Sequence, residues 1–422
     1  MNKRVLLFAT TTGYQIRSFG EAAEKLGVRL VLASDRCDRL EDPWWDQAIP
    51  VRYHDEAQSV ETVIASAAGI HGVIAVGDRP TILAAHVGQA LGLPANPPEA
   101  ARASRNKRDS RVAFKAAGLP TPWFESVPAD RDPEEVAAWV SYPCVLKPLA
   151  LSGSRGVMRA DDPASFVAAF HRLRRILESI DVRQERDVVH DEVLIESFVP
   201  GHEFAVEGLL HDGAFRALAI FDKPDPLDGP FFEETLYVTP SRAPEDVQER
   251  IIGAVATAAA ALGLRHGPIH AECRVNDGRV FVLEVAGRPI GGLCARALRF
   301  TDSGGAAVSL EELLLRHAIG EDVSAFVRER AASGAMMIPI PHRGVFRGVR
   351  GVEDAQRVTG IEEVRVTAKP DALLVPLPEG RSYLGFIFAR AGSPRGVERA
   401  LRDAHARLEF VIEREIPVVS GT

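Results

Sequence analysis

Residues 281–292, FVLEVAGRPIGG, decide how this 422-residue chain is interpreted. The stretch begins as an apolar strand, but the carboxylate of Glu284 stands between Leu283 and Val285. Arg288 follows in the turn after the strand. A strand that only fills a core carries no such charge, because a buried charge without a partner is costly to remove from water. Glu284 and Arg288 are therefore candidate functional residues.

The segment HAECRV at 270–275 pairs with this strand in a predicted β-hairpin. Successive side chains of a strand point to opposite faces, so His270, Glu272 and Arg274 share one face. Whether Glu272 also meets Glu284 depends on the register of the hairpin, and the register depends on the turn.

Two turns can be drawn around the sequence NDG at 276–278. A two-residue turn at 277–278 would set Glu272 opposite Leu283 and leave Glu284 on the other face. A three-residue loop with Gly278 left-handed would set Glu272 diagonal to Glu284. A shared site for the two carboxylates requires the three-residue loop, and this is the register that we expect.

A Ser- and Gly-rich loop, LSGSRGV at 151–157, follows the strand YPCVLKPL at 142–149. Small residues let backbone N–H groups approach an anion closely, and such a nest suits phosphate. Lys147 lies inside the apolar strand, where a lysine needs a compensating anion. The loop lacks the GK[ST] ending of a P-loop and no helix follows it, so it is either a different phosphate loop or only a turn.

Two carboxylates that meet across a hairpin repel each other unless a cation lies between them. Hard oxygen ligands close to phosphates suit Mg²⁺. One alternative is that Glu272 and Glu284 are separate, solvated charges at a sheet edge. Another is a zinc site formed by His266, His270 and Glu272, although the sequence has neither HExxH nor paired cysteines there.

The composition is that of an ordinary globular protein, with 46% hydrophobic and 26% charged residues. A formal net charge of −8 argues against nucleic-acid and anionic-membrane partners, which require a basic surface. We therefore expect small-molecule partners, and both a monomer and a homodimer fit the sequence. Four cysteines without CxxC spacing indicate reduced thiols, and the N-terminus reads as a first strand, so we expect a cytoplasmic location. No apolar run is long enough to span a bilayer.

Strand and helix patterns alternate over residues 1–100, which is typical of a Rossmann-like parallel sheet with crossover helices. The first turn, TTTGYQ at 10–15, lacks GxGxxG and does not support a dinucleotide site. The Pro-rich segment LPANPPEA at 93–100 closes this first domain. Strands are predicted at 5–10, 28–34 and 72–77, and helices at 16–26, 59–68 and 81–91.

The pattern changes after residue 101, where helices are predicted at 102–117, 164–180 and 245–262 and antiparallel strands at 192–199 and 203–221. The charged stretch DVRQERDVVHDE at 181–192 is interpreted as a mobile surface loop. The last ninety or so residues contain the apolar runs AMMIPIP and SYLGFIFARA and a helix at 397–410, and are interpreted as a small α+β domain.

Five motifs in one order resemble the ATP-grasp superfamily of carboxylate–amine and carboxylate–thiol ligases, over about residues 101–319. The segment FDKPDPLDGPFFEETLYVTPS at 221–241 and the two C-terminal runs are most similar to the dipeptide-forming L-amino-acid ligase branch. The five motifs are NKRDSRVAFKAAGLPTP, PCVLKPLALSGSRGV, VLIESFVPGHEF, GPIHAECRV and VFVLEVAGRPIGG.

The resemblance implies a multidomain α/β and α+β fold. Its domains would be a Rossmann-like pre-ATP-grasp domain at 1–100, an ATP-grasp domain at 101–325 with a lid at about 120–200, and a C-terminal α+β domain at 326–422. It also implies ATP and Mg²⁺, or Mn²⁺ in its place, as cofactors. An acyl-phosphate would form from a carboxylate, and an amine would then displace phosphate to give an amide.

Site residues follow from the motif matches. The ATP-binding positions are Lys107, Lys147, Ser152, Gly153, Ser154, Gly156, Glu196, Ser197, Val199 and Glu203. The lysines would contact phosphates, the residues at 196–199 adenine, and Glu203 the ribose. Glu272 and Glu284 would hold the metal. The substrate-binding positions are His270, Arg288, Gly291 and Gly292, with Arg288 and Lys147 as catalytic residues.

One position departs from the family. Its usual asparagine two residues after the second glutamate is Ala286 here, so a second Mg²⁺ site would lack one ligand. Lys107 could instead be a solvated helix lysine, and His270 a hydrogen-bonded structural histidine. Two other functions stay open: a purine-pathway ATP-grasp enzyme, either a carboxylase or formate-using, and a catalytically silent ATP-binding regulator.

Overall fold

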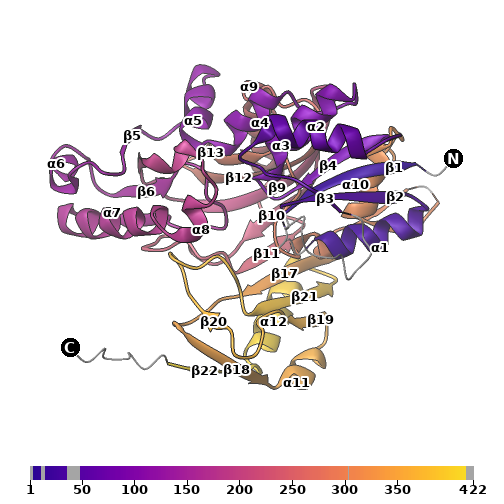
Figure 1. Ribbon diagram of the computed structural model, residues 1–422. Coiled ribbons are helices and arrows are strands. Elements are labelled where there is room, and N and C mark those ends of the chain that lie inside the picture. Colours follow the sequence, from indigo (N-terminus) through magenta and orange to yellow (C-terminus); the bar gives the residue numbers. More distant parts are fainter. Residues whose placement is uncertain (1–2, 11–14, 36–47, 303, 415–422) are drawn as a thin grey trace.

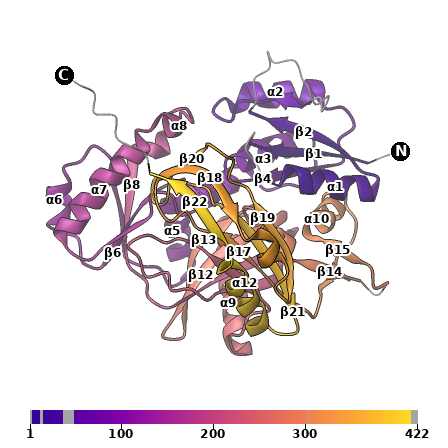
Figure 2. The same ribbon diagram turned by 90° about the horizontal axis from the view of Figure 1, so that it is seen from below.

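The computed structural model describes residues 3–10, 15–35, 48–302 and 304–414. Within these residues the strands form five sheets. Figure 1 shows the N-terminal unit, the lid and the C-terminal segment arranged around a central sheet, and Figure 2 shows the lid and the N-terminal unit on opposite sides of it. The chain is thus the mixed, multidomain α/β protein that the sequence predicts. In the part of the chain that the structure describes, no helix has the length and apolar character needed to cross a membrane.

The N-terminal unit is a parallel four-stranded sheet in the order β3-β2-β1-β4. Its elements agree with the predicted ones to within about three residues. Most of the TTTGYQ turn, and Cys37, lie outside the described residues. The elements are β1 (Arg4–Ala9), α1 (Ile16–Leu26), β2 (Arg29–Ser34), β3 (Ile49–Pro50), α2 (Glu56–Ser66), β4 (Gly72–Val76) and α3 (Pro80–Ala90).

The single helix predicted at 102–117 is wrong, because two helices occupy this region: α4 (Pro98–Arg105) and α5 (Lys107–Ala116). Asn106 between them has an extended backbone, and its side chain accepts hydrogen bonds from the N–H groups of Arg108 and Asp109. Asparagine is a favourable N-cap, so it ends one helix and begins the next. The break makes Lys107 the first residue of α5.

The lid is an antiparallel sheet in the order β5-β8-β6-β7, with helices packed on it. Residues 181–192, interpreted from the sequence as a mobile surface loop, contain most of α8 and all of η1 and are held by ion pairs, so the stretch is not a loop throughout. Arg155 pairs with Asp181 at 2.6 Å, and Arg105 with Glu185 at 3.1 Å. The lid elements are β5 (Phe124–Pro128), α6 (Pro133–Ala137), β6 (Cys144–Pro148), β7 (Met158–Ala160), α7 (Pro163–Leu177), α8 (Ile180–Arg183), η1 (Val188–Asp191) and β8 (Glu192–Ser197).

The central sheet has eight strands in the order β13-β12-β9-β10-β11-β17-β21-β19, so strands of the C-terminal segment continue it. One face packs on α5 and α9 through Val206 and its neighbours, and the other shares a core with the N-terminal unit through Ala205. The strands are β9 (His202–His211), β10 (Ala214–Lys223), β11 (Leu236–Thr239), β12 (Gly267–Asn276), β13 (Arg279–Ala286), β17 (Ala332–Ile338), β19 (Ile361–Val366) and β21 (Gly385–Ala391), and α9 is Glu245–Ala261.

The remaining elements complete the C-terminal half. The helix predicted at 397–410 ends early, at His405, and Phe410 lies in a strand. These elements are η2 (Cys294–Ala297), β14 (Arg299–Thr301), β15 (Ala307–Ser309), α10 (Leu310–Ala318), β16 (Val327–Arg328), β18 (Gly344–Arg350), α11 (Val352–Gln356), β20 (Leu373–Leu374), α12 (Pro394–His405) and β22 (Glu409–Glu413).

The hairpin β12–β13 differs from the expected one. Asn276 pairs with Arg279, so the turn has two residues, both left-handed: Asp277 with φ 48° and Gly278 with φ 74°. The expected three-residue loop is therefore wrong. The two glutamates still meet, because the register shifts after Glu272 and brings it directly opposite Glu284.

The shift is a β-bulge that makes Leu283 an extra residue. Val282 and Val285 both pack in the core on the α9 side, whereas Leu283 and Glu284 both line the cavity on the other side. The carbonyl of Leu283 accepts a hydrogen bond of 2.9 Å from the fully buried Arg111. The bulge thus supplies the one-residue offset that the turn does not.

Arg111 connects α5 to the lid and to this bulge, since its guanidinium also binds both oxygens of Glu196. We expect Arg111→Met to lower the free energy of unfolding by about 3–5 kcal/mol, because it leaves buried partners without their cation. Arg108→Met on the same helix, where the side chain is 39% exposed, is the matched control, with an expected loss below about 1 kcal/mol. Urea unfolding followed by circular dichroism measures both, and equal losses would contradict the assigned role of Arg111.

Candidate active site

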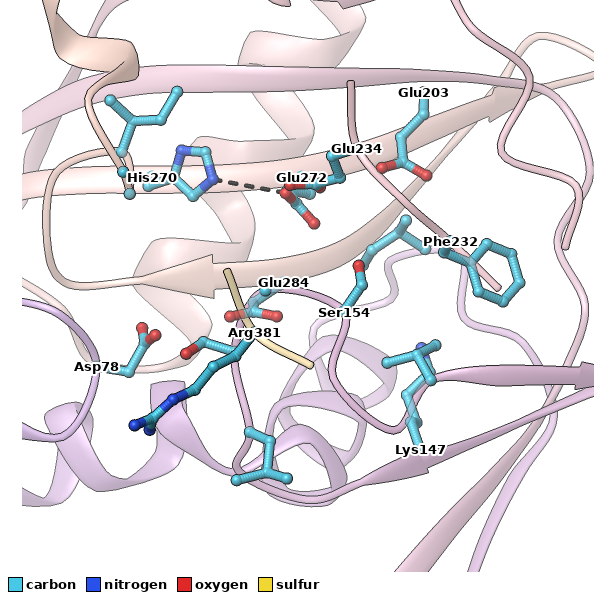
Figure 3. A pocket seen from close by; sticks show the side chains of 18 of the residues that line it. Asp78, Lys147, Ser154, Glu203, Phe232, Glu234, His270, Glu272, Glu284 and Arg381 are labelled. Atoms are coloured by element: carbon cyan, nitrogen blue, oxygen red, sulfur yellow. Dashed lines mark ion pairs between the residues drawn. The ribbon is translucent and has the colours of Figure 1, made fainter. Parts of the chain in front are cut away.

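A cavity of about 340 Å³ lies where the central sheet, the lid, the N-terminal unit and the C-terminal segment meet (Figure 3). Every site residue predicted from the sequence lines it except Gly156. The predicted residues that line it are Lys107, Lys147, Ser152, Gly153, Ser154, Glu196, Ser197, Val199, Glu203, His270, Glu272, Glu284, Arg288, Gly291 and Gly292.

A buried ammonium group lies among three carboxylates on one side of the cavity. The Nζ atom of Lys223 is 2.8 Å from Glu203, 2.5 Å from Glu234 and 2.9 Å from Glu272. Burial alone would lower the pKa of Lys223, but the three carboxylates raise it well above its usual value. Lys223 is therefore a permanent cation that compensates this acidic group. Glu203 lies on β9, Glu272 on the neighbouring β12, and Glu234 in the segment before β11 (Figure 3).

Glu234 has a raised pKa in this group. Burial, and then the charge of Glu272, raise the pKa of Glu234 to about 7. Tyr237 donates a hydrogen bond of 2.9 Å to it. One oxygen from each of Glu203, Glu234 and Glu272 lies within 4.8 Å of the others, so the three could share a cation. Neither Glu234 nor Lys223 is marked by a recognisable motif, although both lie in the segment 221–241.

The second predicted metal ligand, Glu284, lies beside Lys107. The Nζ atom of Lys107 is 3.3 Å from Glu284 and donates a 3.0 Å hydrogen bond to the carbonyl of Leu151. Lys107 is only 8% exposed, so the alternative of a solvated helix lysine is wrong. The alternative that both glutamates are separate solvated charges is also wrong, since each pairs with a buried lysine in one cavity.

Lys147 pairs with an anion, Glu196, as expected for a lysine in an apolar strand. Its Nζ atom lies 2.5 Å from Glu196, whose other oxygen is 2.8 Å from Arg111. Although burial favours the protonated acid, the two cations lower the pKa of Glu196 to about 2. Burial lowers the pKa of Lys147 itself. The chain Arg111, Glu196 and Lys147 therefore holds one ammonium group at the wall of the cavity.

The Ser/Gly loop has an exposed tip and an anchored end. Gly153 and Ser154 have left-handed backbones, with φ 64° and 54°, and line the cavity, as expected of an anion nest. Gly156 instead packs against α7, where an added Cβ would lie 2.9 Å from Leu173. Its N–H donates a 2.9 Å hydrogen bond to the carbonyl of Pro378 in the C-terminal segment.

Glu379, the next residue of that segment, also binds the lid. Its backbone carbonyl accepts a 3.0 Å hydrogen bond from Arg155, and its carboxylate binds the guanidinium of Arg172 on α7. The end of the Ser/Gly loop is therefore fixed to residues 378–379, while the tip at 152–154 faces the cavity.

Arg288 is held by Asp78, a residue that no sequence motif marks. Its guanidinium makes a two-point ion pair with Asp78, at 2.7 and 3.1 Å, and donates to the carbonyl of Pro289 at 3.0 Å. Asp78 follows β4 and precedes α3, at the end of a parallel strand. Such strand ends commonly carry functional side chains, which is the signal that could have identified it.

His270 lies between two carboxylates, hydrogen-bonded to Glu207 and 3.6 Å from Glu272. It makes the structural hydrogen bond of the alternative, and it also lines the cavity. The predicted alternative of a zinc site with His266 is wrong, since His266 packs against His211 and His317 instead.

The far wall of the cavity comes from the C-terminal segment. Gly291 has open space where a Cβ would lie, and a Cβ on Gly292 would lie 3.0 Å from the ring of Phe386. Tyr383 and Arg381 also line this wall, and Arg381 is exposed and makes no ion pair within the described residues. No sequence motif marks Arg381, Tyr383 or Phe386 individually as a site residue.

The donor set suits a divalent cation. Glu272 and Glu284 supply hard oxygen ligands on facing strands, and both line the cavity. Ala286 is buried, lies outside the cavity lining and has no donor atom, so it cannot replace the asparagine of the family pattern.

His270 should make stability depend on pH. Burial acts against its charge, but Glu207 raises its pKa from 6.5 to about 9. The stabilisation from this pair is therefore complete below about pH 6.5 and is lost as the pH rises through about 9. We expect the difference in unfolding free energy between the wild-type protein and His270→Gln to shrink over this range. His202→Gln, at the exposed start of β9, is the control, and a difference independent of pH would contradict the assignment.

Two families match parts of the chain. The ATP-grasp domain matches residues 140–297, and the L-amino acid ligase C-terminal domain 2 matches residues 336–413. The alanine–anticapsin ligase of Bacillus subtilis is 27% identical over 273 residues, which cover 61% of this chain and 57% of that protein. The matching part of this chain spans less than two thirds of the length of its most similar curated relatives.

Solved structures extend the likeness over the whole chain. The L-amino acid ligase of Bacillus licheniformis is 26% identical with a TM-score of 0.78, covering 98% of this chain and 99% of that one. A carboxyaminoimidazole ribonucleotide synthase of Aspergillus clavatus has a TM-score of 0.70 at 17% identity, covers 96% and 99% of the two chains, and shows the fold alone. The chain therefore contains an ATP-grasp domain and, after it, a domain that matches the C-terminal domain 2 of L-amino acid ligases.

Proposed function

We propose that the protein is an ATP-dependent ligase that joins the carboxylate of an amino acid to an amine and releases ADP and phosphate. The observation that carries this proposal is the grouping of Lys107, Lys147, Glu272, Glu284 and Arg288 around one cavity. The five residues come from three separate parts of the chain. Together they supply cations for phosphates, oxygen ligands for a metal and a fork for a carboxylate.

The nucleotide lies between the lid and the central sheet in this proposal. Lys107 and Lys147 contact its phosphates, and the tip of the Ser/Gly loop at 152–154 covers them. The segment 196–199 contacts adenine, and Glu203 contacts the ribose hydroxyls. The support is that all of these groups line the same cavity and that both lysines are buried cations.

Glu272 and Glu284 hold Mg²⁺ in this proposal, with Mn²⁺ as a substitute. When bound, the ion neutralises phosphate charge and so favours attack on the terminal phosphorus. The carboxylate of Glu234, whose pKa is about 7, lies next to Glu272 and can join as an anion above that pH. Glu272 and Glu284 supply ligands for one metal ion. Ala286 has no side-chain ligand atom, so a second metal ion is not part of the proposal.

Arg288 binds the substrate carboxylate. Asp78 fixes the orientation of the guanidinium, which a planar fork needs for recognising a carboxylate or an acyl-phosphate. A carboxylate oxygen attacks the γ-phosphorus and forms an acyl-phosphate. The bond from this phosphorus to the oxygen that bridges the β- and γ-phosphates breaks, and ADP departs as the leaving group. The amine nitrogen then attacks the acyl carbon, phosphate leaves and the amine loses a proton.

Water must be excluded, since it would hydrolyse the acyl-phosphate. The Ser/Gly loop on the lid and the wall formed by Tyr383 and Phe386 enclose the reacting groups from opposite sides. Most of this protein's catalytic contribution would therefore be positioning, charge neutralisation and enclosure.

The two other functions have less support. The match to an L-amino acid ligase C-terminal domain at 336–413 favours amino-acid ligation over a purine-pathway reaction. A silent regulator would tolerate loss of charged site residues, yet Lys147, Glu272, Glu284 and Arg288 all line the cavity. The cytoplasm as its location and a homodimer as its assembly remain predictions, and size-exclusion chromatography with light scattering tests the latter.

The test of function is phosphate release from Mg·ATP across a matrix of amino-acid pairs, with mass spectrometry of the products. We expect release with at least one pair and a new amide of matching mass. Release by no pair and no single carboxylate, in protein shown to be saturated with ATP, would overturn the ligase proposal in favour of the regulator.

Glu284→Gln should reduce kcat by about 10²–10³-fold, because it removes a charged metal ligand while keeping the shape of the side chain. Glu249→Gln, on the exposed face of α9, is the control for loss of one carboxylate and should leave kcat unchanged. Raising the Mg²⁺ concentration should partly restore the variant. Unchanged turnover in Glu284→Gln would remove this residue from the metal site.

Arg288→Lys keeps the charge but loses the planar fork. We expect kcat/KM for the carboxylate substrate to fall by about 10–100-fold, since one bidentate contact is lost, while KM for ATP changes by less than about threefold. Arg279→Lys, at the exposed start of β13, the strand that precedes Arg288, is the control. A main effect on KM for ATP would place Arg288 at the nucleotide instead.

A further inference from the structure

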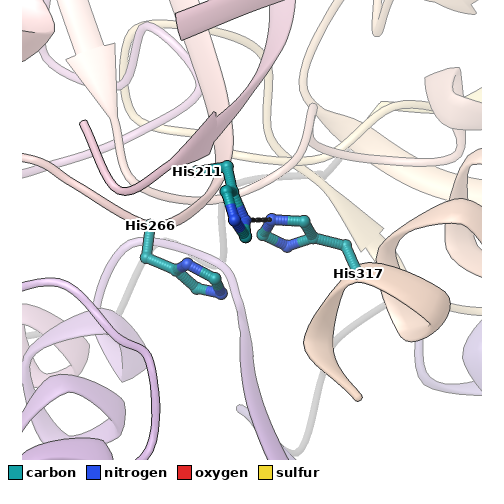
Figure 4. A group of neighbouring side chains, drawn as sticks. All are labelled: His211, His266 and His317. Carbon is teal, nitrogen blue, oxygen red and sulfur yellow. Dashed lines mark hydrogen bonds between the residues drawn. The ribbon is translucent and has the colours of Figure 1, made fainter. Parts of the chain in front are cut away.

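Three histidines form a cluster outside the cavity (Figure 4). His211 ends β9, His266 immediately precedes β12, and His317 lies in the last turn of α10. None of them lines the active-site cavity. His266 is four residues before His270, which corresponds to about 13 Å along an extended strand. The cluster is therefore a separate feature that the proposed ligase reaction does not use.

The spacing of the ring nitrogens fits a shared ligand. Nδ1 of His211 and Nε2 of His317 are 3.4 Å apart, and one nitrogen from each of the three rings lies within 4.8 Å of the others. Zinc bound by imidazole at 2.0–2.1 Å in tetrahedral geometry requires nitrogens about 3.3 Å apart. Nδ1 of His211 and Nε2 of His317 already have about this separation. The ring of His266 is stacked on His317 and would have to rotate to direct a nitrogen at the same ion.

The rings of His266 and His317 are available as neutral ligands. His317 is 5% exposed, and Nδ1 of His266 is buried with no hydrogen-bond partner. Burial, with the neighbouring imidazoles, lowers the pKa of His266 to about 4 and that of His317 to about 3. A neutral imidazole nitrogen is the form that binds a metal. A buried nitrogen without a partner in a group of three is what a metal ion would satisfy.

The surrounding charges are mixed. Asp212 acts on His266 and Asp322 lies close to His211, and both carboxylates favour a cation. Arg216 acts on His317 in the opposite direction, but its guanidinium is bound to the carbonyls of Ser324 and Phe326, at 2.9 and 3.2 Å. The carboxylates offset the arginine, so the site is not repulsive to a divalent ion.

We propose that His211, His266 and His317 form a binding site for a divalent transition-metal ion, with Zn²⁺ the best fit, distinct from the carboxylate site for Mg²⁺. Three imidazoles leave a fourth position for water, and His211 is exposed, so solvent can reach it. Nitrogen ligands select zinc, nickel, cobalt or copper over magnesium. The bound ion would fasten α10 to the ends of β9 and β12, which is a structural role.

The experiment uses the full chain without a polyhistidine tag, dialysed against a chelator. Calorimetric titration with Zn²⁺ alone should give one site per chain, Co²⁺ should produce the intense visible absorption of tetrahedral coordination, and excess Mg²⁺ should not compete. Saturating Zn²⁺ should raise the melting temperature by a few degrees, because it binds only the folded chain.

Variants separate this site from other sources of binding. His211→Ala and His317→Gln should each weaken Zn²⁺ binding by at least about 100-fold, since each removes one of three ligands. His342→Ala, at an exposed histidine after β17, is the matched control and should bind as the wild type does. The double variant Glu272→Gln, Glu284→Gln should also keep the site.

Because His211 is exposed, His211→Ala should fold normally and so decides the matter if His317→Gln does not fold. Absence of a stoichiometric Zn²⁺ site in the wild type would overturn the proposal. Binding that survives both histidine variants would do the same, and binding lost only in the glutamate variant would assign the ion to the cavity.

Discussion

Buried carboxylates need buried cations, and this requirement organises the cavity on which the rest of the structure converges. Lys223 compensates Glu272, and Lys107 compensates Glu284, so two like charges can face each other across one hairpin. In the proposed reaction, phosphates compete for Lys107, and its carboxylate partner then needs another cation. In that proposal nucleotide and metal binding are coupled by this exchange of partners, because each would correct the charge that the other leaves unbalanced.

The hairpin shows how a local irregularity produces the site. The tight turn at 277–278 by itself would place Glu284 on the face that packs against α9. The bulge at Leu283 reverses this by letting two successive side chains face the cavity. Arg111 stabilises the bulge by binding its carbonyl, and the same guanidinium binds Glu196 in the lid. One buried arginine thus sets the relation between the proposed metal ligands and the residues proposed to lie beside the nucleotide.

Sequence patterns predicted most of the fold where a single periodicity dominates. The helix at 16–26 was predicted to the residue, and the strand with Lys147 was predicted together with its need for an anion. The break at Asn106 was missed because a cap residue can also occur inside a polar helix. The ordered stretch 181–192 was missed because its charges are neutralised by Arg105 and Arg155, which are distant in the sequence.

The candidate site was likewise predictable only where a motif within the sequence marks a residue. Residues within motifs were found, whereas Asp78, Lys223, Glu234 and Arg381 were not, because their importance depends on which distant side chain each one faces. The bulge was unpredictable for a related reason. Its register follows from pairing with β9 and contact with Arg111, and no pattern within the hairpin encodes either.

The anchoring of the Ser/Gly loop to residues 378–379 limits how this protein can be recombined with its relatives. Gly156 and Arg155 bind backbone carbonyls there, and Arg172 binds the Glu379 side chain. A C-terminal segment grafted from a relative would also replace the residues to which the lid is bound. An exchange at this contact therefore has to include both sides, so that the Ser/Gly loop and the C-terminal wall of the cavity are transferred as one unit.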